Sequence, residues 1–427
     1  MTLDLAGVGI GPVNLSLAAL ADPVPDLSVA MFERRKEFRW HPGLLIEGAT
    51  IQVPFLADLV TLADPTHPLS FLNYLRDRDR LFPFYFAEKF HIARTEYDDY
   101  CRWAADRLGS CRFGIEVTGI DWRDGAFRLS TGDSEPVAAR NVVLGVGSSP
   151  YVPEPLHPLV SDPTAPVVHS ADYLTERERL LAAPTVVVVG SGQSGAEVFL
   201  DLLRRRGRPD GLRWIARTEA FAPMEYSKLG LEQFTPDYTR FFHGLAESTR
   251  DTLLPAQWQL YKGIDSATMA EIHGELYRLS IGGGWPQVTM TPGAEVVSAS
   301  IVDGRIVLGL RHRHQGTSAV WQADAVVAAT GYTETSVERL LGPLADRLRT
   351  DASGRPVVDA DYRLRLDGVT GSVFVQNAER HTHGVGTPDL GLAAWRAASI
   401  VNSVCGREIY RRPSRTAFTR FGLTEEK

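Results

Sequence analysis

One short stretch near the N-terminus constrains the fold of this chain more than any other. The apolar run at residues 3–8 enters a turn at Gly9 and continues as an apolar segment with helical periodicity, so the predicted order is buried strand, tight loop and helix. Gly7 permits the sharp turn, and Gly9 lets backbone N–H groups approach a pyrophosphate at the helix N-terminus. Pro12 replaces the third glycine of the usual fingerprint, and proline suits the first helical turn because its missing N–H would have no partner there. The stretch predicts a dinucleotide-binding unit.

The acid that such a unit places on the ribose is found at the end of the next apolar run. Residues 27–33 predict the second strand, which ends in Glu33 at the distance from the glycine turn expected of a ribose hydroxyl ligand. Glu33 is therefore the candidate for the adenosine ribose. The alternative is a solvated glutamate at a strand end.

A second, more regular nucleotide-binding unit follows in the middle of the chain. A β-branched strand leads into Gly190, Gly192 and Gly195, which satisfy G-x-G-x-x-G before a predicted helix. The second strand of this unit, 212–217, ends in Arg217 where an NAD-selective site would carry an acid. A cation at this position favours a 2′-phosphate, so the unit is predicted to bind NADP rather than NAD. The alternative is a surface arginine.

Two dinucleotide folds in one chain are most simply explained if one holds a flavin and the other brings a nicotinamide to reduce it. We therefore expect an α/β protein with two Rossmann-like dinucleotide-binding domains and a smaller, mostly helical insertion. The FAD-binding domain would comprise residues 1–155 and 325–410, the NADPH-binding domain residues 160–220 and 285–324, and the helical substrate-binding insertion residues 221–284.

The last strand and helix are expected to return to the flavin. Residues 372–377 predict a strand, and residues from about 388 to 404 predict a long helix with Pro388 as a good first residue. The stretch 383–390 would then place a helix N-terminus beside the pyrimidine edge of the flavin, where it would stabilise negative charge on the reduced ring.

Charge and cysteine content exclude several kinds of partner and site. The 427 residues carry a net charge of -7 without an extended basic run, which argues against nucleic acid and anionic membranes as partners. Three cysteines without a C-x-x-C pair, and histidines without metal-ligand spacing, predict neither a disulfide framework nor a metal site. No apolar run approaches the ~20 residues of a membrane span, and the N-terminus lacks the basic region of a signal peptide. We expect a cytoplasmic protein.

Several motifs taken together resemble those of the siderophore-biosynthetic lysine/ornithine N-monooxygenases, in the same order over nearly the whole chain. They are residues 7–15, Phe38-Arg39-Trp40-His41-Pro42-Gly43, residues 52–60, residues 190–195, Ala329-Thr330-Gly331-Tyr332 and His381-Thr382-His383-Gly384. The resemblance implies FAD, NADPH and dioxygen, and hydroxylation of a terminal primary amine through a hydroperoxyflavin in hydroxamate siderophore biosynthesis. It also implies a homo-oligomer, either a dimer or a tetramer.

The resemblance implies site residues as well. Gln52 would lie against the flavin near the reaction centre as the catalytic residue, and Trp40 and His41 would border the isoalloxazine. The NADP contacts would be Gln193, Ser194, Arg217 and Tyr261, with Gly190 and Gly192 in the turn. The remaining candidate cofactor-binding residues are Gly7, Gly9, Pro12, Asn14, Glu33, Arg34, Thr330, Pro388 and Leu390.

The substrate site must present the attacking amine nitrogen in its neutral form. An alkylamine resembling the lysine side chain titrates near ~10.4, so the neutral form at physiological pH requires about 4 kcal/mol at ~1.36 kcal/mol per pKa unit. Desolvation in an apolar pocket supplies such a shift without a dedicated base. We therefore expect apolar walls and nominate no general base.

One departure from the family pattern bears on the substrate. In amino-acid-using members the segment Phe-Leu-x-Asp-Leu-Val carries lysine at x, which pairs with the substrate carboxylate, whereas this chain has Ala57 there, after Leu56. The asparagines that hold the α-amino group in ornithine-specific members align with Leu231 and Leu260. A buried carboxylate without its partner costs roughly 3–5 kcal/mol, or about two to three decades of affinity. The predicted substrate is a short diamine, cadaverine first, then putrescine or diaminopropane.

Other interpretations stay open. Lys228, Lys262 or an arginine of the insertion would replace the missing cation if the substrate is L-lysine or L-ornithine. Residues 169–173 resemble half of the fingerprint of other class B flavin monooxygenases, but the preceding Phe-x-Gly is absent. A non-catalytic NADP-sensing protein would bind nucleotide without forming product. Flavin disulfide reductases are excluded because the chain lacks a redox cysteine pair.

Overall fold

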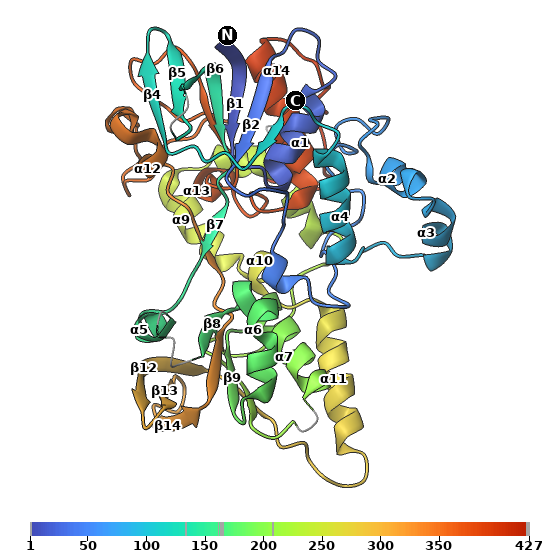
Figure 1. Cartoon of the computed structure of the whole chain (residues 1–427), viewed down its shortest axis with the longest axis vertical. Helices are drawn as coiled ribbons and strands as arrows, with labels where there is room; N and C mark the ends of the chain where they lie inside the picture. Colours follow the sequence, from blue (N-terminus) through green and yellow to red (C-terminus); the bar gives the residue numbers. More distant parts are fainter. Residues whose placement is uncertain (1, 133–134, 161, 163–165, 207–208, 424–427) are drawn as a thin grey trace.

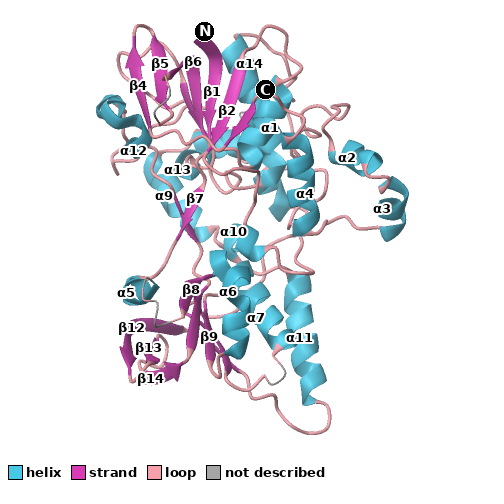
Figure 2. Ribbon diagram, viewed as in Figure 1, coloured by secondary structure: helices cyan, strands magenta, loops and turns pink. Residues whose placement is uncertain are grey.

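The computed structural model describes residues 2–423, apart from 133–134, 161, 163–165 and 207–208. Two units, each with its own parallel sheet, lie one above the other along the long axis of the molecule (Figure 1), and helices cover both sheets (Figure 2). The predicted α/β class with two Rossmann-like sheets is confirmed.

The upper unit contains a seven-stranded sheet in the order β3-β2-β1-β6-β5-β4, with β17 beside β6. β1 pairs in parallel with both β2 and β6, and the antiparallel strands β4 and β5 extend the sheet beyond β6. β17 also pairs in parallel with β6, so the last strand of the chain returns to the first sheet as predicted. The bounds are β1 (Thr2–Val8), β2 (Val29–Glu33), β3 (Cys111–Phe113), β4 (Gly119–Arg123), β5 (Ala126–Ser130), β6 (Val137–Leu144) and β17 (Val373–Val375).

Helix α1 (Pro12–Ala21) lies at the centre of the upper unit. Every one of its residues is buried, because it packs against α14 (Ala393–Cys405) and α4 (Arg94–Ala105) as well as against the sheet. A helix that is covered on all sides needs small and apolar residues all round, which is why its sequence shows little amphipathic pattern. Helices α2 (Phe71–Asp77) and α3 (Leu81–Ala87) project from the side of this unit (Figure 1).

The lower unit contains a parallel sheet in the order β11-β10-β9-β15-β8 between two layers. One layer consists of helices α6, α7 and α11, and the other is the antiparallel sheet β12-β13-β14. Val186 and Val188 of β9 pack against the helices, and Val187 and Val189 pack against the antiparallel sheet. This double burial explains the unbroken β-branched run. The bounds are β8 (Val167–His169), β9 (Val186–Val189), β10 (Leu212–Ala216), β11 (Thr289–Pro292), β12 (Ala294–Val302), β13 (Arg305–His312), β14 (Ser318–Ala323), β15 (Ala325–Ala328), α6 (Tyr173–Ala182), α7 (Gln193–Arg205) and α11 (Ser266–Ser280).

Two of the connections between the units run side by side, because β7 (Ser148–Pro150) pairs antiparallel with β16 (Tyr332–Glu334) at the junction. The helices of residues 221–284 lie on both sides of that junction, since α8 contacts α13 while α11 covers α7. The remaining helices are α5 (His157–Val160), α8 (Pro236–His243), α9 (Glu247–Ala256), α10 (Gln259–Lys262), α12 (Glu338–Leu341) and α13 (Arg380–His383).

The last helix begins later than the sequence predicted. Pro388 is exposed in a turn, and α14 begins only at Ala393, so the prediction of Pro388 as the first helical residue was wrong. The carboxylate of Asp389 accepts a hydrogen bond from the Gly391 N–H (2.6 Å) and caps a short 3-10 helix, Leu390–Leu392. This local side-chain bond offers the backbone an alternative to α-helical pairing.

A buried ion pair joins the two units. Arg94, the first residue of α4, donates two hydrogen bonds to the carboxylate of Glu197 in α7, at 2.9 and 2.7 Å, and a third to the Leu44 carbonyl at 2.8 Å. The two side chains are only 11% and 5% exposed. Beside this pair the backbones nearly touch, because a Cβ on Gly43 would lie 1.8 Å from the Ala171 carbonyl oxygen. The pair and this close backbone approach therefore join the two units directly.

Replacing Arg94 with methionine should leave the Glu197 carboxylate buried and unpaired, and such a loss costs about 3–5 kcal/mol. We expect R94M to lower the free energy of unfolding, measured by urea denaturation, by an amount of that order. R349M is the matched control, because the Arg349–Asp367 pair is exposed on both sides and such pairs contribute about 0–1 kcal/mol. Equal stability of R94M and R349M would contradict the buried pair.

Candidate active site

The first glycine turn lies between the carboxyl end of β1 and the N-terminus of α1. Gly9 has a φ of +86°, and a Cβ there would lie 2.4 Å from the Gly145 carbonyl oxygen, so only glycine fits. The Asn14 amide donates hydrogen bonds across the turn to the carbonyls of Val8 (3.2 Å) and Gly9 (2.7 Å). The structure thus places Asn14 as a brace of the turn, and its direct contact with a cofactor stays a prediction.

The N-terminus of α1 has the donor chemistry that a pyrophosphate requires. Its N-cap, Gly11, has no side chain to satisfy the free N–H groups, Pro12 occupies the first turn, and no acid lies in that turn. A Cβ on Gly11 would meet no atom within 4 Å, so the space outside the turn is open. Unpaired N–H groups at the positive end of a helix dipole bind phosphate oxygens. The residues present therefore fit the dinucleotide that the sequence predicts.

Glu33 faces the same turn from the end of β2. Its carboxylate accepts hydrogen bonds from the N–H groups of Ile10 (3.0 Å) and Arg35 (2.9 Å), which fixes it at the carboxyl edge of the sheet. This is the edge at which such folds bind ribose hydroxyls. Arg34, the next residue, is exposed. The roles of Glu33 and Arg34 toward a ribose stay predictions.

The second glycine turn repeats the plan in the lower unit. A Cβ on Gly190 would lie 2.0 Å from the Ala329 carbonyl oxygen, and one on Gly195 would lie 2.4 Å from the Gly190 carbonyl oxygen. Helix α7 begins after Gly192 without a side-chain cap or an acid in its first turn. The same chemistry therefore fits a second pyrophosphate, and the half-buried Ser194 lies in that first turn.

Gln193 holds this second turn to helix α11. Its amide oxygen accepts a hydrogen bond from the Asp265 N–H (2.7 Å), and its amide nitrogen donates to Glu197 (3.0 Å) and to the Thr268 hydroxyl (3.1 Å). Thr330 has a comparable position between the units, since its hydroxyl donates to the Tyr151 carbonyl. Both side chains are engaged within the protein, and their cofactor contacts stay predictions.

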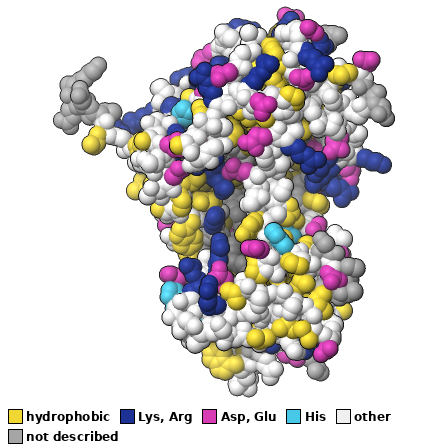
Figure 3. All heavy atoms as spheres, turned by 90° about the vertical axis from the view of Figure 1, so that its left-hand side faces the viewer, with side chains coloured by type: hydrophobic (Ala, Val, Ile, Leu, Met, Phe, Trp, Pro, Cys, Tyr) yellow, Lys and Arg dark blue, Asp and Glu magenta, His cyan; other side chains and the backbone are white. Residues whose placement is uncertain are grey.

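Cations surround Tyr261 near the end of β10. Lys262 and Arg380 lie 5.4 and 5.5 Å from the Tyr261 ring. Burial, followed by the charges of Arg380 and Arg217, lowers the pKa of the Lys262 ammonium group. Figure 3 shows Lys and Arg side chains gathered where the two units meet. Such a group suits a phosphate dianion. Arg217 and Tyr261 were predicted from the sequence as NADP contacts, whereas Lys262 and Arg380 were not, although both are basic residues next to motif residues.

Aromatic rings from both units meet at the junction. Trp40 lies 5.1 Å from His41, His41 lies 5.6 Å from Tyr332, and Tyr332 lies 5.2 Å from His169, as distances between ring centroids. His41 keeps an exposed edge, yet the protein packed around it lowers its pKa to about 4 by desolvation and then by the charges of Arg94 and Arg35. The imidazole is therefore neutral at physiological pH. Its place beside the isoalloxazine of a flavin stays a prediction.

Two buried polar groups at this junction have no partner in the described part of the chain. They are the amide nitrogen of Gln52 and the hydroxyl of Tyr332. A buried donor without an acceptor costs about 1–3 kcal/mol, so a ligand that accepts from it is stabilised. A flavin ring carries carbonyl and nitrogen acceptors along its edge. The residues therefore fit a flavin here, and the role of Gln52 beside it stays a prediction.

The segment that carries Leu56 and Ala57 meets the turn before α14. Ala57 is 4% exposed, and a Cβ on Gly391 would lie 3.9 Å from the Ala57 Cβ. Leu390, in the same turn, packs on the core of the upper unit. Leu260 is buried in a small cluster of the helical region, and Leu231 is half-buried in the 3-10 helix Gly230–Phe234. The roles of these leucines beside the substrate amine stay predictions.

Asp389 is a carboxylate near Ala57 that the sequence analysis did not identify. Burial raises its pKa to about 6, partly offset by the hydrogen bond from Gly391 and by the charge of Arg396. Its charge contributes to the raised pKa values of Tyr97 and Tyr226, after burial as the main cause, so Asp389 is within electrostatic range of each tyrosine. The available signal was an acid between two candidate residues, Pro388 and Leu390, in an otherwise uncharged stretch.

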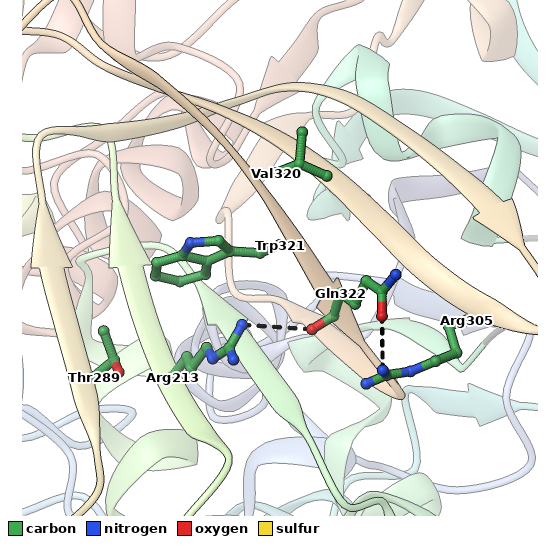
Figure 4. A pocket seen from close by; sticks show the side chains of 6 residues that line it. All are labelled: Arg213, Thr289, Arg305, Val320, Trp321 and Gln322. Atoms are coloured by element: carbon green, nitrogen blue, oxygen red, sulfur yellow. Dashed lines mark hydrogen bonds between the residues drawn. The ribbon is translucent and has the colours of Figure 1, made fainter.

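The cavity drawn in Figure 4 lies away from these residues, in the lower unit. It has a volume of about 510 Å³. The Arg213 guanidinium stacks over Trp321 at 4.9 Å and donates to the Gln322 carbonyl, and Arg305 donates to the Gln322 side chain (2.8 Å) and to Asp324 (3.1 Å). Because both guanidinium groups are partnered within the protein, we assign no ligand to this cavity.

Among the described residues, none of the helices combines the length and apolarity needed to cross a membrane. Within the same residues, no cluster of three or more His, Cys, Asp or Glu side chains is arranged to hold a metal ion.

Comparison with known proteins gives consistent matches. The family model described as L-lysine 6-monooxygenase/L-ornithine 5-monooxygenase matches residues 1–334. The rhizobactin siderophore biosynthesis protein RhbE of Rhizobium meliloti is 45% identical, over 98% of this chain and 95% of its own length. The FAD-bound cadaverine monooxygenase DfoA of Erwinia amylovora is similar over the whole of both chains, with 36% identity and a TM-score of 0.94. The Kutzneria ornithine N-hydroxylase KtzI, with NADP+ and L-ornithine, covers 95% of this chain and 99% of its own, with 30% identity and a TM-score of 0.87.

Replacing Arg217 with alanine should weaken binding of NADP+ at least tenfold, because a hydrogen bond to a charged group contributes about 1.5–3 kcal/mol and each ~1.4 kcal/mol is a factor of ten. Isothermal titration measures the Kd directly. R213A is the matched control, since Arg213 lies on β10, the strand that Arg217 directly follows, and lines the cavity of Figure 4. An unchanged Kd in R217A, or an equal loss in R213A, would refute the assignment.

Proposed function

The chain belongs to the L-lysine 6-monooxygenase/L-ornithine 5-monooxygenase family, and from that premise we propose that it N-hydroxylates one terminal amine of a short aliphatic diamine in siderophore biosynthesis. Cadaverine is the favoured substrate, followed by putrescine and diaminopropane. One observation carries the choice of a diamine: Ala57 is buried at the position where amino-acid-using members carry a lysine.

In this proposal residues 1–155 and 325–410 hold FAD, and residues 160–220 and 285–324 hold NADPH. When bound, FAD supplies the ring that activates dioxygen and NADPH supplies the electrons for it. The N-terminus of α1 would bind the FAD pyrophosphate, and Trp40, His41 and the unpaired amide of Gln52 would border its ring. The N-terminus of α7, with Arg217 and Lys262, would bind NADPH.

The reacting nitrogen must lose its proton before it attacks. The rings of Trp40 and Tyr97, whose centroids lie 5.0 Å apart, supply apolar surface, and Asp389 is near enough to Tyr97 to affect its pKa. Such surroundings disfavour an ammonium ion and lower the pKa of an amine. The chain's residues thus favour the neutral amine by excluding water.

The other end of a diamine stays charged, and Asp389 is suited to hold it. One carboxylate oxygen is engaged by the Gly391 N–H, which leaves the second oxygen for an ammonium group. An α-carboxylate at the same place would meet the charge of Asp389 without a cation at position 57, and like charges at short range repel. The presence of Asp389 close to the uncharged Ala57 thus supports a diamine over an amino acid.

Hydroxylation of L-lysine or L-ornithine is the alternative, and it requires another cation. Lys228 is exposed, and Lys262 lies with Arg380 at Tyr261, where the proposal places a phosphate. The name of KtzI shows that relatives at this level of similarity include ornithine hydroxylases. An experiment is therefore needed to decide between diamines and amino acids as substrates.

Cadaverine should be hydroxylated with a kcat/KM at least about a hundredfold above that of L-lysine, because an unpaired buried carboxylate costs roughly 3–5 kcal/mol. Hydroxylamine formation with NADPH and oxygen is measured for both. A57K should narrow or reverse this ratio, whereas A57M, which adds comparable bulk without charge, should not. A higher kcat/KM for lysine in the unmodified chain would reject the diamine proposal. Nucleotide binding without any amine-dependent product would support a sensor instead.

Replacing Asp389 with asparagine should raise the KM for cadaverine at least tenfold, and the KM for a monoamine such as pentylamine much less, because only the diamine carries a distal ammonium. The pH dependence gives a second readout. Since the pKa of Asp389 is raised to about 6, the carboxylate is charged above that pH and protonates below it. The KM ratio of cadaverine to pentylamine should therefore rise as pH falls through 6 in the unmodified chain and stay flat in D389N. Equal effects on both amines would refute this role.

A further inference from the structure

Helix α3 carries large apolar side chains that the rest of the described chain does not cover. Phe82, Tyr85 and Phe86 are 76%, 71% and 75% exposed, and Phe90, just after the helix, is 51% exposed. No residue of α3 is buried. Figure 1 shows α3 as the outermost helix on the side of the upper unit. A helix of seven residues has little stability of its own in water. A contiguous exposed aromatic patch of this kind is typical of an interaction site.

The same surface offers both projecting rings and a hollow that would accept them. An apolar hollow of about 590 Å³ lies beside α3, and two of the projecting rings, Phe82 and Tyr85, line it together with Phe55, Leu72, Phe84 and Phe90. A surface with both projections and a hollow has the two parts that a self-complementary contact needs. This is the requirement of an isologous contact, in which the same patch of two copies meets across a two-fold axis.

The area is sufficient for such a contact. A buried aromatic side chain covers about 150–250 Å², so the exposed parts of Phe82, Tyr85, Phe86 and Phe90 represent roughly 400–700 Å² per chain. Two copies would therefore bury about 1,000 Å² from these rings alone, which is the lower limit for a specific interface. Leu72 and Leu81, each more than two-fifths exposed, add to it.

The charges at the edge of the patch favour a second copy over a membrane surface. Glu88 and Lys89 lie together at the end of α3 and line the same hollow, so both signs are present. Arg78 and Arg80 are already paired with Asp99 (3.6 Å) and Glu96 (2.7 Å). Anionic lipid surfaces attract clusters of unpaired Lys and Arg, which the described residues of this edge do not provide. We propose that α3 and the hollow beside it form a two-fold contact between two copies of this chain.

The oligomeric state of the full-length, FAD-loaded protein tests the proposal. Sedimentation velocity should show an even multiple of the 47.0 kDa chain. The variant F82E/F86E should halve that mass at the same concentration, or raise the dimer Kd at least tenfold. The control I281E/V320E adds the same charges at equally exposed apolar positions of the lower unit and should leave the mass unchanged.

Three outcomes would overturn the proposal. They are a wild-type chain that is monomeric at all concentrations, an F82E/F86E variant that keeps the wild-type mass, and a monomeric chain that binds vesicles of neutral or anionic phospholipid through this patch. Circular dichroism and retained FAD show that each variant is folded. If F82E/F86E fails that check, F82A/F86A replaces it and should weaken the dimer in the same direction.

Discussion

The geometry of the whole molecule depends on the buried pair between Arg94 and Glu197. Each unit has its own sheet and its own main core, and the loop that carries Leu44 and Ile46 extends from the upper unit into the core of the lower one. The Arg94–Glu197 pair lies beside this loop, together with the backbone contact at Gly43. Glu197 also accepts a hydrogen bond from Gln193, the first residue of α7. Arg94 begins the helix that carries Tyr97. One ion pair therefore links the second glycine turn to the helix that supports the predicted substrate wall.

The candidate site is defined by what the protein leaves unsatisfied at this junction. Gln52 and Tyr332 keep buried polar atoms without partners, and both glycine turns keep helix N–H groups uncapped. Buried polar groups usually have partners in native proteins, so these are groups that a bound ligand would pair. By contrast, the guanidinium groups of the cavity in Figure 4 already have partners within the protein.

Local patterns predicted much of this arrangement, and the failures have physical causes. The glycine turns, Pro12 at the start of α1 and the strand ends at Glu33 and Arg217 follow from short-range rules. The start of the last helix does not, because the side chain of Asp389 caps a 3-10 turn that hydrophobic periodicity cannot reveal.

Contacts between distant segments were also invisible in the sequence. The approach of Ala57 to Gly391, the cations around Tyr261 and the pairing of Arg94 with Glu197 each join segments that only the tertiary fold brings together. The exposure of α3 could not be predicted either, because it depends on the absence of a long-range contact. An apolar run such as residues 81–87 is typical of a core helix, and only the fold shows that nothing in the described chain covers it.

The most direct test of the central claim follows the visible absorbance of the purified protein during anaerobic mixing with NADPH and, separately, with NADH. If the upper unit holds FAD and the lower unit brings a 2′-phosphorylated nicotinamide to it, the protein is yellow and NADPH bleaches it much faster than NADH. A colourless chain that cannot take up FAD, or a flavin reduced equally fast by both nucleotides, would contradict the account.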